Sequence, residues 1–98
     1  MNKIDIINKL QETIQAAGNK NFNQKLAKTT VDTIIDSIKD AITKGERVEI
    51  RGFGSFSLRK YKAYKGRNPK SGEVVYVEPK KLPYFKVGKE LKDMIWKG

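Results

Sequence analysis

A stretch that cannot pack into an apolar core is the feature that most constrains the fold of this chain. Residues 59–72 include six basic residues, no acidic residue and no aliphatic residue larger than alanine. Tyr61 and Tyr64 are interleaved with the charges, and Pro69 stands among turn-forming residues. Because burying unpaired charge is strongly unfavourable, this stretch has to project from the body of the protein. We therefore expect a basic hairpin with a rigid proline at its turn.

The charge is distributed unevenly between the two halves of the chain. The 98 residues have a formal net charge of +10, but residues 1–50 contribute only +1, from eight Lys/Arg and seven Asp/Glu. Residues 51–98 contribute +9, from thirteen Lys/Arg and four Asp/Glu. The first half is typical of a solvated scaffold and the second of a surface that meets an anion. The length allows one small domain, and a projecting hairpin leaves a still smaller body, so we expect self-association.

The hydrophobic pattern predicts two helices in the first half. The first is expected over residues 3–15 with Asn2 as its N-cap, because apolar residues recur at helical spacing. These residues are Ile4, Ile7, Leu10 and Ile14. A second helix is expected over residues 23–44. Its acidic row is interpreted as a solvated face and consists of Asp32, Asp36 and Asp40.

The period changes to two in the second half, which predicts strands. We expect strands at residues 47–51, 55–65 and 74–77, with a tight turn at residues 52–54. A short helix is expected over residues 87–96. The predicted fold class is α+β. It has two N-terminal helices, a three-stranded antiparallel sheet with an extended β-ribbon arm, and a short C-terminal helix.

Composition argues against catalysis and against metal binding. The chain has no histidine and no cysteine, which removes the usual general base, thiol chemistry and the commonest metal ligand. Its serines have no imidazole to activate them. We expect no enzyme activity, no metal and no cofactor. No apolar run approaches the roughly 20 residues that span a bilayer, so we expect a soluble cytoplasmic protein that does not bind membranes.

From the residues alone, the basic hairpin has two interpretations. One is contact with nucleic-acid phosphates, because the charges lie on a strand framework that ends in a rigid turn. The other is a solvated charge run closed by an ordinary turn. Within the first interpretation, a basic RNA-binding or ribosome-associated protein also fits the composition.

Three motifs resemble, in order, those of the HU/integration host factor family of bacterial architectural DNA-binding proteins. They are GERVEIRGFGSF at residues 45–56, GRNPKSG at residues 66–72 and PYFKVGKELKD at residues 83–93. The resemblance covers nearly the whole chain. It implies an intertwined dimer, either a homodimer or a heterodimer with a related subunit. It also implies one domain over residues 1–98, divided into a helical dimerisation part (1–45), the sheet and DNA-binding arm (46–86) and a C-terminal helix (87–98).

The resemblance further implies roles on double-stranded DNA in the nucleoid. Pro69 at each arm tip would insert between base pairs from the minor groove and bend the duplex, a mechanism known for the family. Such bending would serve nucleoid compaction and nucleoprotein assembly. The arm residues implied to contact DNA are Arg59, Lys60, Lys62, Lys65, Arg67, Asn68 and Lys70. Those of the body and flank are Lys3, Glu49, Arg51, Lys86 and Lys89.

A finer resemblance points to the β subunit of integration host factor. Glu49 and Arg51 match a pair with which that subunit places an arginine in the minor groove and favours a particular site. The alternative is an ion pair between neighbours on an ordinary strand.

Two features depart from the family pattern. Residues 15–21 form a longer connection between the helices, whose role the sequence leaves open. Tyr61 and Tyr64 stand where the β subunit has arginines, which predicts weaker phosphate contact.

Overall fold

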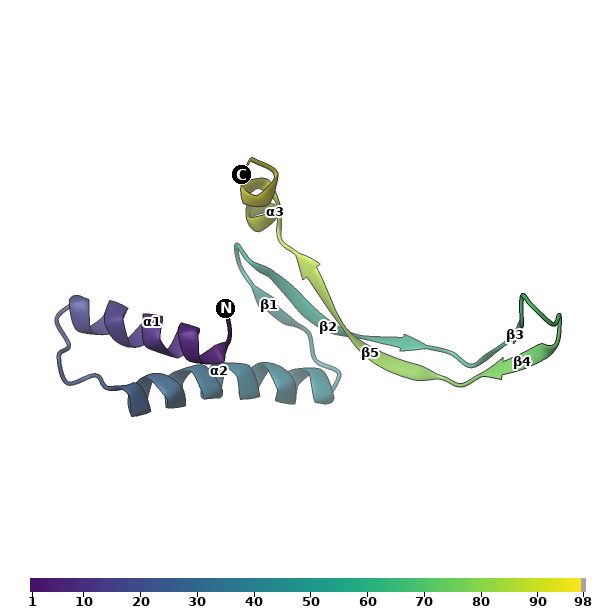
Figure 1. The fold of residues 1–98 in the computed structure, drawn as a ribbon, viewed down its shortest axis with the longest axis horizontal. Helices are drawn as coiled ribbons and strands as arrows, with labels where there is room; N and C mark the ends of the chain where they lie inside the picture. Colours follow the sequence, from purple (N-terminus) through teal and green to yellow (C-terminus); the bar gives the residue numbers. More distant parts are fainter. Residues whose placement is uncertain (98) are drawn as a thin grey trace. The chain divides into compact units, whose positions relative to one another are not determined.

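The computed structural model describes residues 1–97, which form two units. The first unit comprises residues 1–40 and the second begins at residue 41. Along the described residues, two helices are followed by five strands and a final helix (Figure 1). This element content confirms the α+β class.

The first unit is a pair of helices around a small apolar core. α1, Lys3–Ala16, starts with the expected cap. Oδ1 of Asn2 accepts a hydrogen bond from the backbone N–H of Asp5 (3.3 Å), and Oδ2 of Asp5 accepts one from the backbone N–H of Asn2 (2.9 Å). α2, Gln24–Thr43, packs against α1. The core consists of Ile7, Ala27 and Val31, with Leu10, Phe22 and Ile35 packed against it.

The connection between α1 and α2, residues 17–23, is tied to this core. Nε2 of Gln15 donates a hydrogen bond to the carbonyl of Phe22 (2.7 Å), and the Phe22 ring packs against the core residues. Gly18 adopts a φ of +110°, which glycine tolerates better than other residues. The connection therefore closes the helix pair.

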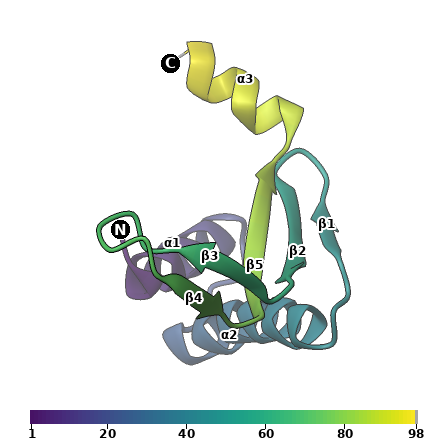
Figure 2. The same ribbon diagram turned by 90° about the vertical axis from the view of Figure 1, so that its right-hand side faces the viewer.

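A three-stranded antiparallel sheet is the base of the second unit. β1 is Val48–Ile50, β2 is Gly54–Tyr61 and β5 is Lys80–Val87. Their order is β1-β2-β5, and Figure 2 shows the three strands side by side. α3, Lys89–Lys97, follows β5.

The hairpin of β2 and β5 continues outward from this sheet (Figure 1). We call residues 59–81 the arm. Its outer part is a separate two-stranded ladder of β3, Tyr64–Arg67, and β4, Val74–Val77. We call this pair the outer ladder.

The structure corrects two strand predictions. The expected unbroken strand over residues 55–65 is wrong, because pairing stops at residues 62–63, opposite residues 78–79. Pro79 has no backbone N–H to continue the pairing. In addition, the third strand of the main sheet is β5, whereas residues 74–77 pair with β3. Pro83 is compatible with β5 because β5 lies at the edge of the sheet.

Three phenylalanines pack together at the base of the sheet. The ring centroid of Phe85 lies 5.2 Å from that of Phe53 and 4.9 Å from that of Phe56. Gly54 makes room for this cluster, because a Cβ there would lie 2.5 Å from Cζ of Phe85 and 2.5 Å from the carbonyl oxygen of Lys86. Gly52, in the confirmed turn between β1 and β2, has a φ of +84°. Both glycines therefore serve the geometry of the sheet.

Candidate nucleic-acid interface

The tip of the arm presents Pro69 to solvent. The backbone N–H of Asn68 donates to the carbonyl of Glu73, and that of Gly72 donates to the carbonyl of Asn68, both at 2.8 Å. The backbone N–H of Lys70 donates to Oδ1 of Asn68 (2.9 Å), which is an Asx turn around the proline. Asn68, predicted as a DNA contact, therefore also shapes the turn that holds Pro69.

The inner part of the arm is basic on both faces. Lys60 is the cross-strand partner of Lys81, so these two like charges share one face. On the opposite face, the guanidinium carbon of Arg59 lies 3.4 Å from the ring centroid of Tyr84, a cation–π contact. Lys80 and Lys81 were not predicted as site residues. Only the pairing register shows that β5 places these two charges beside the basic residues of β2.

The outer ladder and the tip carry the other predicted cations. Lys65 and Arg67 lie two residues apart on β3 and therefore share a face. Lys62 lies where the two ladders meet, and Lys70 lies in the tip turn. All six predicted basic residues of the arm are exposed, namely Arg59, Lys60, Lys62, Lys65, Arg67 and Lys70. The arm is thus an accessible cationic ribbon.

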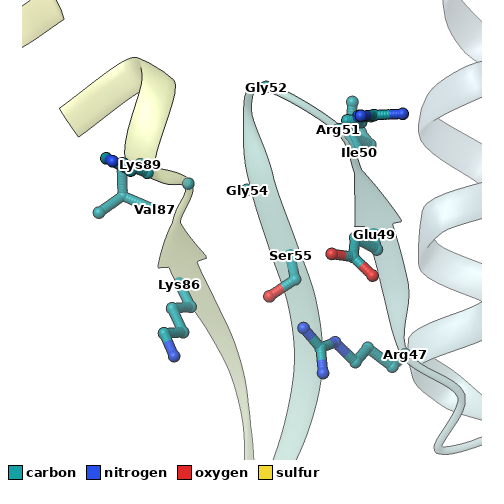
Figure 3. A pocket seen from close by; sticks show the side chains of 11 residues that line it. Arg47, Glu49, Ile50, Arg51, Gly52, Gly54, Ser55, Lys86, Val87 and Lys89 are labelled. Carbon is teal, nitrogen blue, oxygen red and sulfur yellow. The ribbon is translucent and has the colours of Figure 1, made fainter. Parts of the chain in front are cut away.

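A second polar site lies on the main sheet, around a groove of about 330 Å³. Glu49 pairs with Ser55 on β2, and Ser55 pairs with Lys86 on β5, so these three residues form a row across the sheet. Figure 3 shows the row along the groove. Ser55 is only 7% exposed. The structure therefore brings together Glu49 and Lys86, which are 37 positions apart in the chain.

Three other charged residues line this groove. Arg47, which lines the groove, was not predicted as a site residue. Its position two residues before Glu49 could have indicated it, because residues two apart in an extended segment face the same side. Arg51 also lines the groove, but its guanidinium points away from the Glu49 carboxylate (Figure 3). Within residues 1–97 no ion pair joins Glu49 to Arg51. Lys89 lines the groove from the first position of α3.

Lys3, the remaining predicted residue, lies in the first unit and is held by an acidic partner. Its Nζ lies 2.9 Å from Oδ1 of Asp32, and Nζ of Lys28 lies 2.6 Å from Oδ2 of the same carboxylate. Hydrogen bonds from Lys28 and then Lys3 lower the pKa of Asp32 from 3.8 to about 2. The hydrogen bond to Asp32 also raises the pKa of Lys28. Asp32 of the acidic row thus forms two ion pairs at the protein surface, with lysine side chains that are 52% and 60% exposed.

Comparison with known proteins identifies the family. A family model described as bacterial DNA-binding protein matches residues 1–96. The chain belongs to this family. It is 42% identical over 95 residues to DNA-binding protein HU of Geobacillus stearothermophilus, across 97% of this chain and 99% of that protein. HU of Bacillus caldolyticus matches with the same identity and coverage.

Solved structures of HU proteins share the fold. The structure described as an Anabaena HU–DNA cocrystal has a TM-score of 0.73 at 29% identity, with 97% of each chain covered. HU from Thermotoga maritima has a TM-score of 0.61 at 29% identity, covering 97% of this chain and 98% of that one. These matches confirm the resemblance to the HU/integration host factor family, and the relatives named here are HU proteins.

The family is one of DNA-binding proteins rather than of enzymes. Among the described residues, no group of three or more His, Cys, Asp or Glu side chains is placed to hold a metal ion. No helix in residues 1–97 is both long enough and apolar enough to cross a bilayer.

Proposed function

We propose that this chain is an HU-type architectural protein that binds the minor groove of double-stranded DNA and bends it with its arms. The observation that carries the proposal is an exposed basic ribbon with an exposed proline at its tip, in a chain 42% identical to HU over 95 residues. We extend it to a single functional domain over residues 1–98, acting in the cytoplasm at the bacterial nucleoid and contributing to DNA compaction and nucleoprotein assembly.

In the proposed mechanism, Pro69 acts as a wedge. Its ring enters between two base pairs, while Arg67 and Asn68 occupy the minor groove beside it. Unstacking at each wedge costs a few kcal/mol, and smooth bending of a site of about 20–30 base pairs costs about 1–6 kcal/mol. The offsetting free energy comes from phosphate contacts of the arm and from the cations around the groove of the main sheet, among them Lys86 and Lys89.

A bending measurement tests the wedge. Energy transfer between dyes at the two ends of a duplex reports the bend angle with wild-type protein and with Pro69→Ala. We expect Pro69→Ala to bind but to bend the DNA less. Pro79→Ala is the matched control, because Pro79 is also an exposed proline of the arm but lies away from its tip. An unchanged bend with Pro69→Ala, or an equal loss with Pro79→Ala, would remove Pro69 from its proposed role.

A salt titration tests the electrostatic part of the proposal. A protein that neutralises about 6–10 phosphates loses about 10³–10⁵-fold in affinity between 50 and 200 mM salt, because bound counterions are released on binding. The arm and the groove of the main sheet offer at least this many cationic side chains per dimer. A flat titration would contradict phosphate contact as the source of affinity.

The proposal includes a homodimer. The described residues bury only three apolar side chains, Ile7, Ala27 and Val31. Large apolar side chains are exposed in both units, such as Ile34 (55%) and Trp96 (90%). Apolar surface of this kind is typical of an interface. The native mass should correspond to two chains, and the fluorescence of Trp96, the single tryptophan, should shift to the red as the protein is diluted through its dissociation constant. A single-chain mass at all concentrations would refute the dimer.

A second candidate is a sequence-preferring, β-type subunit of an integration-host-factor heterodimer. The observation that favours it is Arg51, whose guanidinium points away from Glu49 and is therefore available to a minor groove (Figure 3). A discrete footprint on mixed-sequence DNA, lost with Arg51→Gln, together with a second co-purified chain, would support this candidate. A continuous ladder of protection and a mass of two identical chains would support the HU-type homodimer.

A further inference from the structure

One face of the hairpin formed by β2 and β5 connects the groove of the main sheet with the arm. Cross-strand partners share a face in an antiparallel pair, and alternate residues face opposite ways. From the groove outward, this face carries Ser55 with Lys86, Ser57 with Tyr84, Arg59 with Leu82 and Tyr61 with Lys80. Six residues separate Ser55 from Tyr61, which is about 20 Å at about 3.3 Å per strand residue. The face therefore places two tyrosines and two cations along one line beyond the groove.

The first of these cations rests on the first of these rings. The guanidinium carbon of Arg59 lies 3.4 Å from the ring centroid of Tyr84. This is close to the separation of about 3.5 Å at which non-bonded carbon atoms attract each other best, so the guanidinium lies directly over the ring. Tyr84 is half-buried, whereas Arg59 is exposed. A guanidinium stacks through its flat face and donates hydrogen bonds through its edge, so this contact leaves N–H donors for a phosphate.

The second pair has the same chemistry with the strands exchanged. Nζ of Lys80, on β5, lies 5.5 Å from the ring centroid of Tyr61, on β2. Within residues 1–97 no carboxylate forms an ion pair with Arg59 or Lys80. On the opposite face Lys60 lies beside Lys81, and among the described residues no ring lies over either of them. Aromatic support is thus confined to the cations on the face that continues the groove.

A ring under a cation has a consequence for binding an anion. Arginine and lysine side chains have many rotamers, and ordering them on binding costs free energy. A carboxylate partner would order them in the free protein, but a phosphate would then have to replace it. An aromatic ring orders the cation and leaves its charge unneutralised, because the attraction comes from the ring quadrupole. Rings beneath Arg59 and Lys80 therefore favour phosphate contact.

We propose that Tyr84 and Tyr61 are positioning residues for DNA binding, whose rings hold Arg59 and Lys80 ready for the phosphates of a duplex that passes from the groove to the arm. The inference rests on the proposed function, which gives neither ring a role. Tyr61, for which weaker phosphate contact was predicted, supports that contact through Lys80 instead.

A double-mutant cycle on DNA affinity tests the first pair. Affinity for one intact duplex is measured at one salt concentration, at a temperature well below the melting temperature of every variant. Tyr84→Leu removes the ring and Tyr84→Phe keeps it, and each is made with and without Arg59→Gln. With Arg59 present, Tyr84→Leu should weaken binding about 2- to 12-fold for each arm, from the cost of ordering one long side chain. Tyr84→Phe should bind like wild type, and in the Arg59→Gln background Tyr84→Leu should have no further effect.

Tyr64→Leu is the matched control. Tyr64 is also an arm tyrosine, it is 59% exposed, and no cation of residues 1–97 lies over its ring. Any effect of Tyr64→Leu should add to that of Arg59→Gln. Wild-type or higher affinity of Tyr84→Leu overturns the proposal, as does an equal loss in the presence and absence of Arg59.

A second cycle, of Tyr61→Leu with Lys80→Gln, tests the outer pair. Coupling between the two substitutions supports the role of Tyr61, and additive effects remove Tyr61 from the proposal. If the wild type does not bind the duplex, the proposed function itself fails. If the wild type binds it and Tyr84→Leu binds equally well, only the present inference fails.

Nuclear magnetic resonance of the wild-type protein provides a check that needs no variant. Protons over the face of an aromatic ring are shielded, so the side-chain protons of Arg59 should resonate upfield of those of Arg67. They should remain upfield when the protein is saturated with duplex. Movement to the position of the Arg67 protons would show that Arg59 leaves the ring to reach a phosphate. That result overturns the proposal, even if Tyr84→Leu fails to fold.

Discussion

Substituting Gly54 by alanine tests how closely the main sheet of this HU-family protein is packed. The φ of Gly54 is not in the positive range, so the backbone conformation accepts alanine. The obstacle is the added methyl group, which would lie 2.5 Å from both the Phe85 ring and the carbonyl oxygen of Lys86. Atoms this close have to move apart, and the carbonyl belongs to β5, the strand paired with β2. The strain therefore falls on the strand pairing as well as on the ring.

The expected loss of stability follows from this geometry. Overpacking in a core costs about 1–3 kcal/mol. We expect the upper part of that range, about 2–3 kcal/mol, because one of the two contacts is with backbone. For a domain of about 100 residues, 1 kcal/mol corresponds to about 4–8 °C in melting temperature, so Gly54→Ala should melt about 8–24 °C below wild type. Thermal and urea unfolding measure this loss of stability. Both proteins are compared at one fixed concentration, because the apparent stability of a dimer depends on concentration.

Gly66→Ala is the matched control. Gly66 also lies in a strand and also lacks a positive φ, but a Cβ there would meet only the Tyr64 ring, at an ordinary 3.4 Å. Its stability should stay within about 0.5 kcal/mol of wild type. If Gly54→Ala is as stable as Gly66→Ala, the close approach of β5 to Gly54 is not a constraint on the fold, and the reasoning is refuted.

Three further predictions concern other contacts. Gly52→Ala should lose about 1–2 kcal/mol, measured by urea unfolding, because a φ of +84° is unfavourable for alanine; wild-type stability would show that the turn relaxes freely. A double-mutant cycle of Arg59→Gln and Tyr84→Leu should give a coupling of about 0.5–1 kcal/mol, and additive effects would show that the cation–π contact contributes nothing. Because the pKa of Asp32 is lowered from 3.8 to about 2, its contribution to stability is present above pH 3.8 and lost as the pH falls through 2. Asp32→Asn should therefore remove part of the acid sensitivity between pH 4 and 2, and a pH profile identical to wild type would contradict the ion pairs of Asp32 with Lys28 and Lys3.

Local sequence was sufficient for the features whose partners are near in the chain. The cap formed by Asn2 and Asp5 and the Asx turn around Pro69 each close within a few residues, so their chemistry is visible in the sequence itself. The charge of the arm was equally readable. Residues 59–72 have no aliphatic side chain larger than that of alanine, and all of them except Gly66 are exposed.

Predictions failed or were missing where distant segments meet. The interruption of the arm depends on Pro79 lying opposite residues 62–63, and the main sheet is completed by β5 rather than by residues 74–77. Lys80 and Lys81 were missed as interface candidates for the same reason, since each gains its neighbour through strand pairing. Hydrophobic period identifies a strand but does not identify its partner.

The amino-acid sequence alone determined that this chain has an amphipathic helical half and a cationic half that contains a proline turn, because those properties depend on composition and on spacing within a few residues. Tertiary structure alone decided that Glu49, Ser55 and Lys86 form one row and that Lys3 is held by Asp32, 29 positions away. It also decided that Tyr76 of β4 shares a face of the outer ladder with Lys65 and Arg67 of β3. These arrangements depend on strand register and on helix packing. In a strand, a register shift of one residue would turn each side chain to the opposite face.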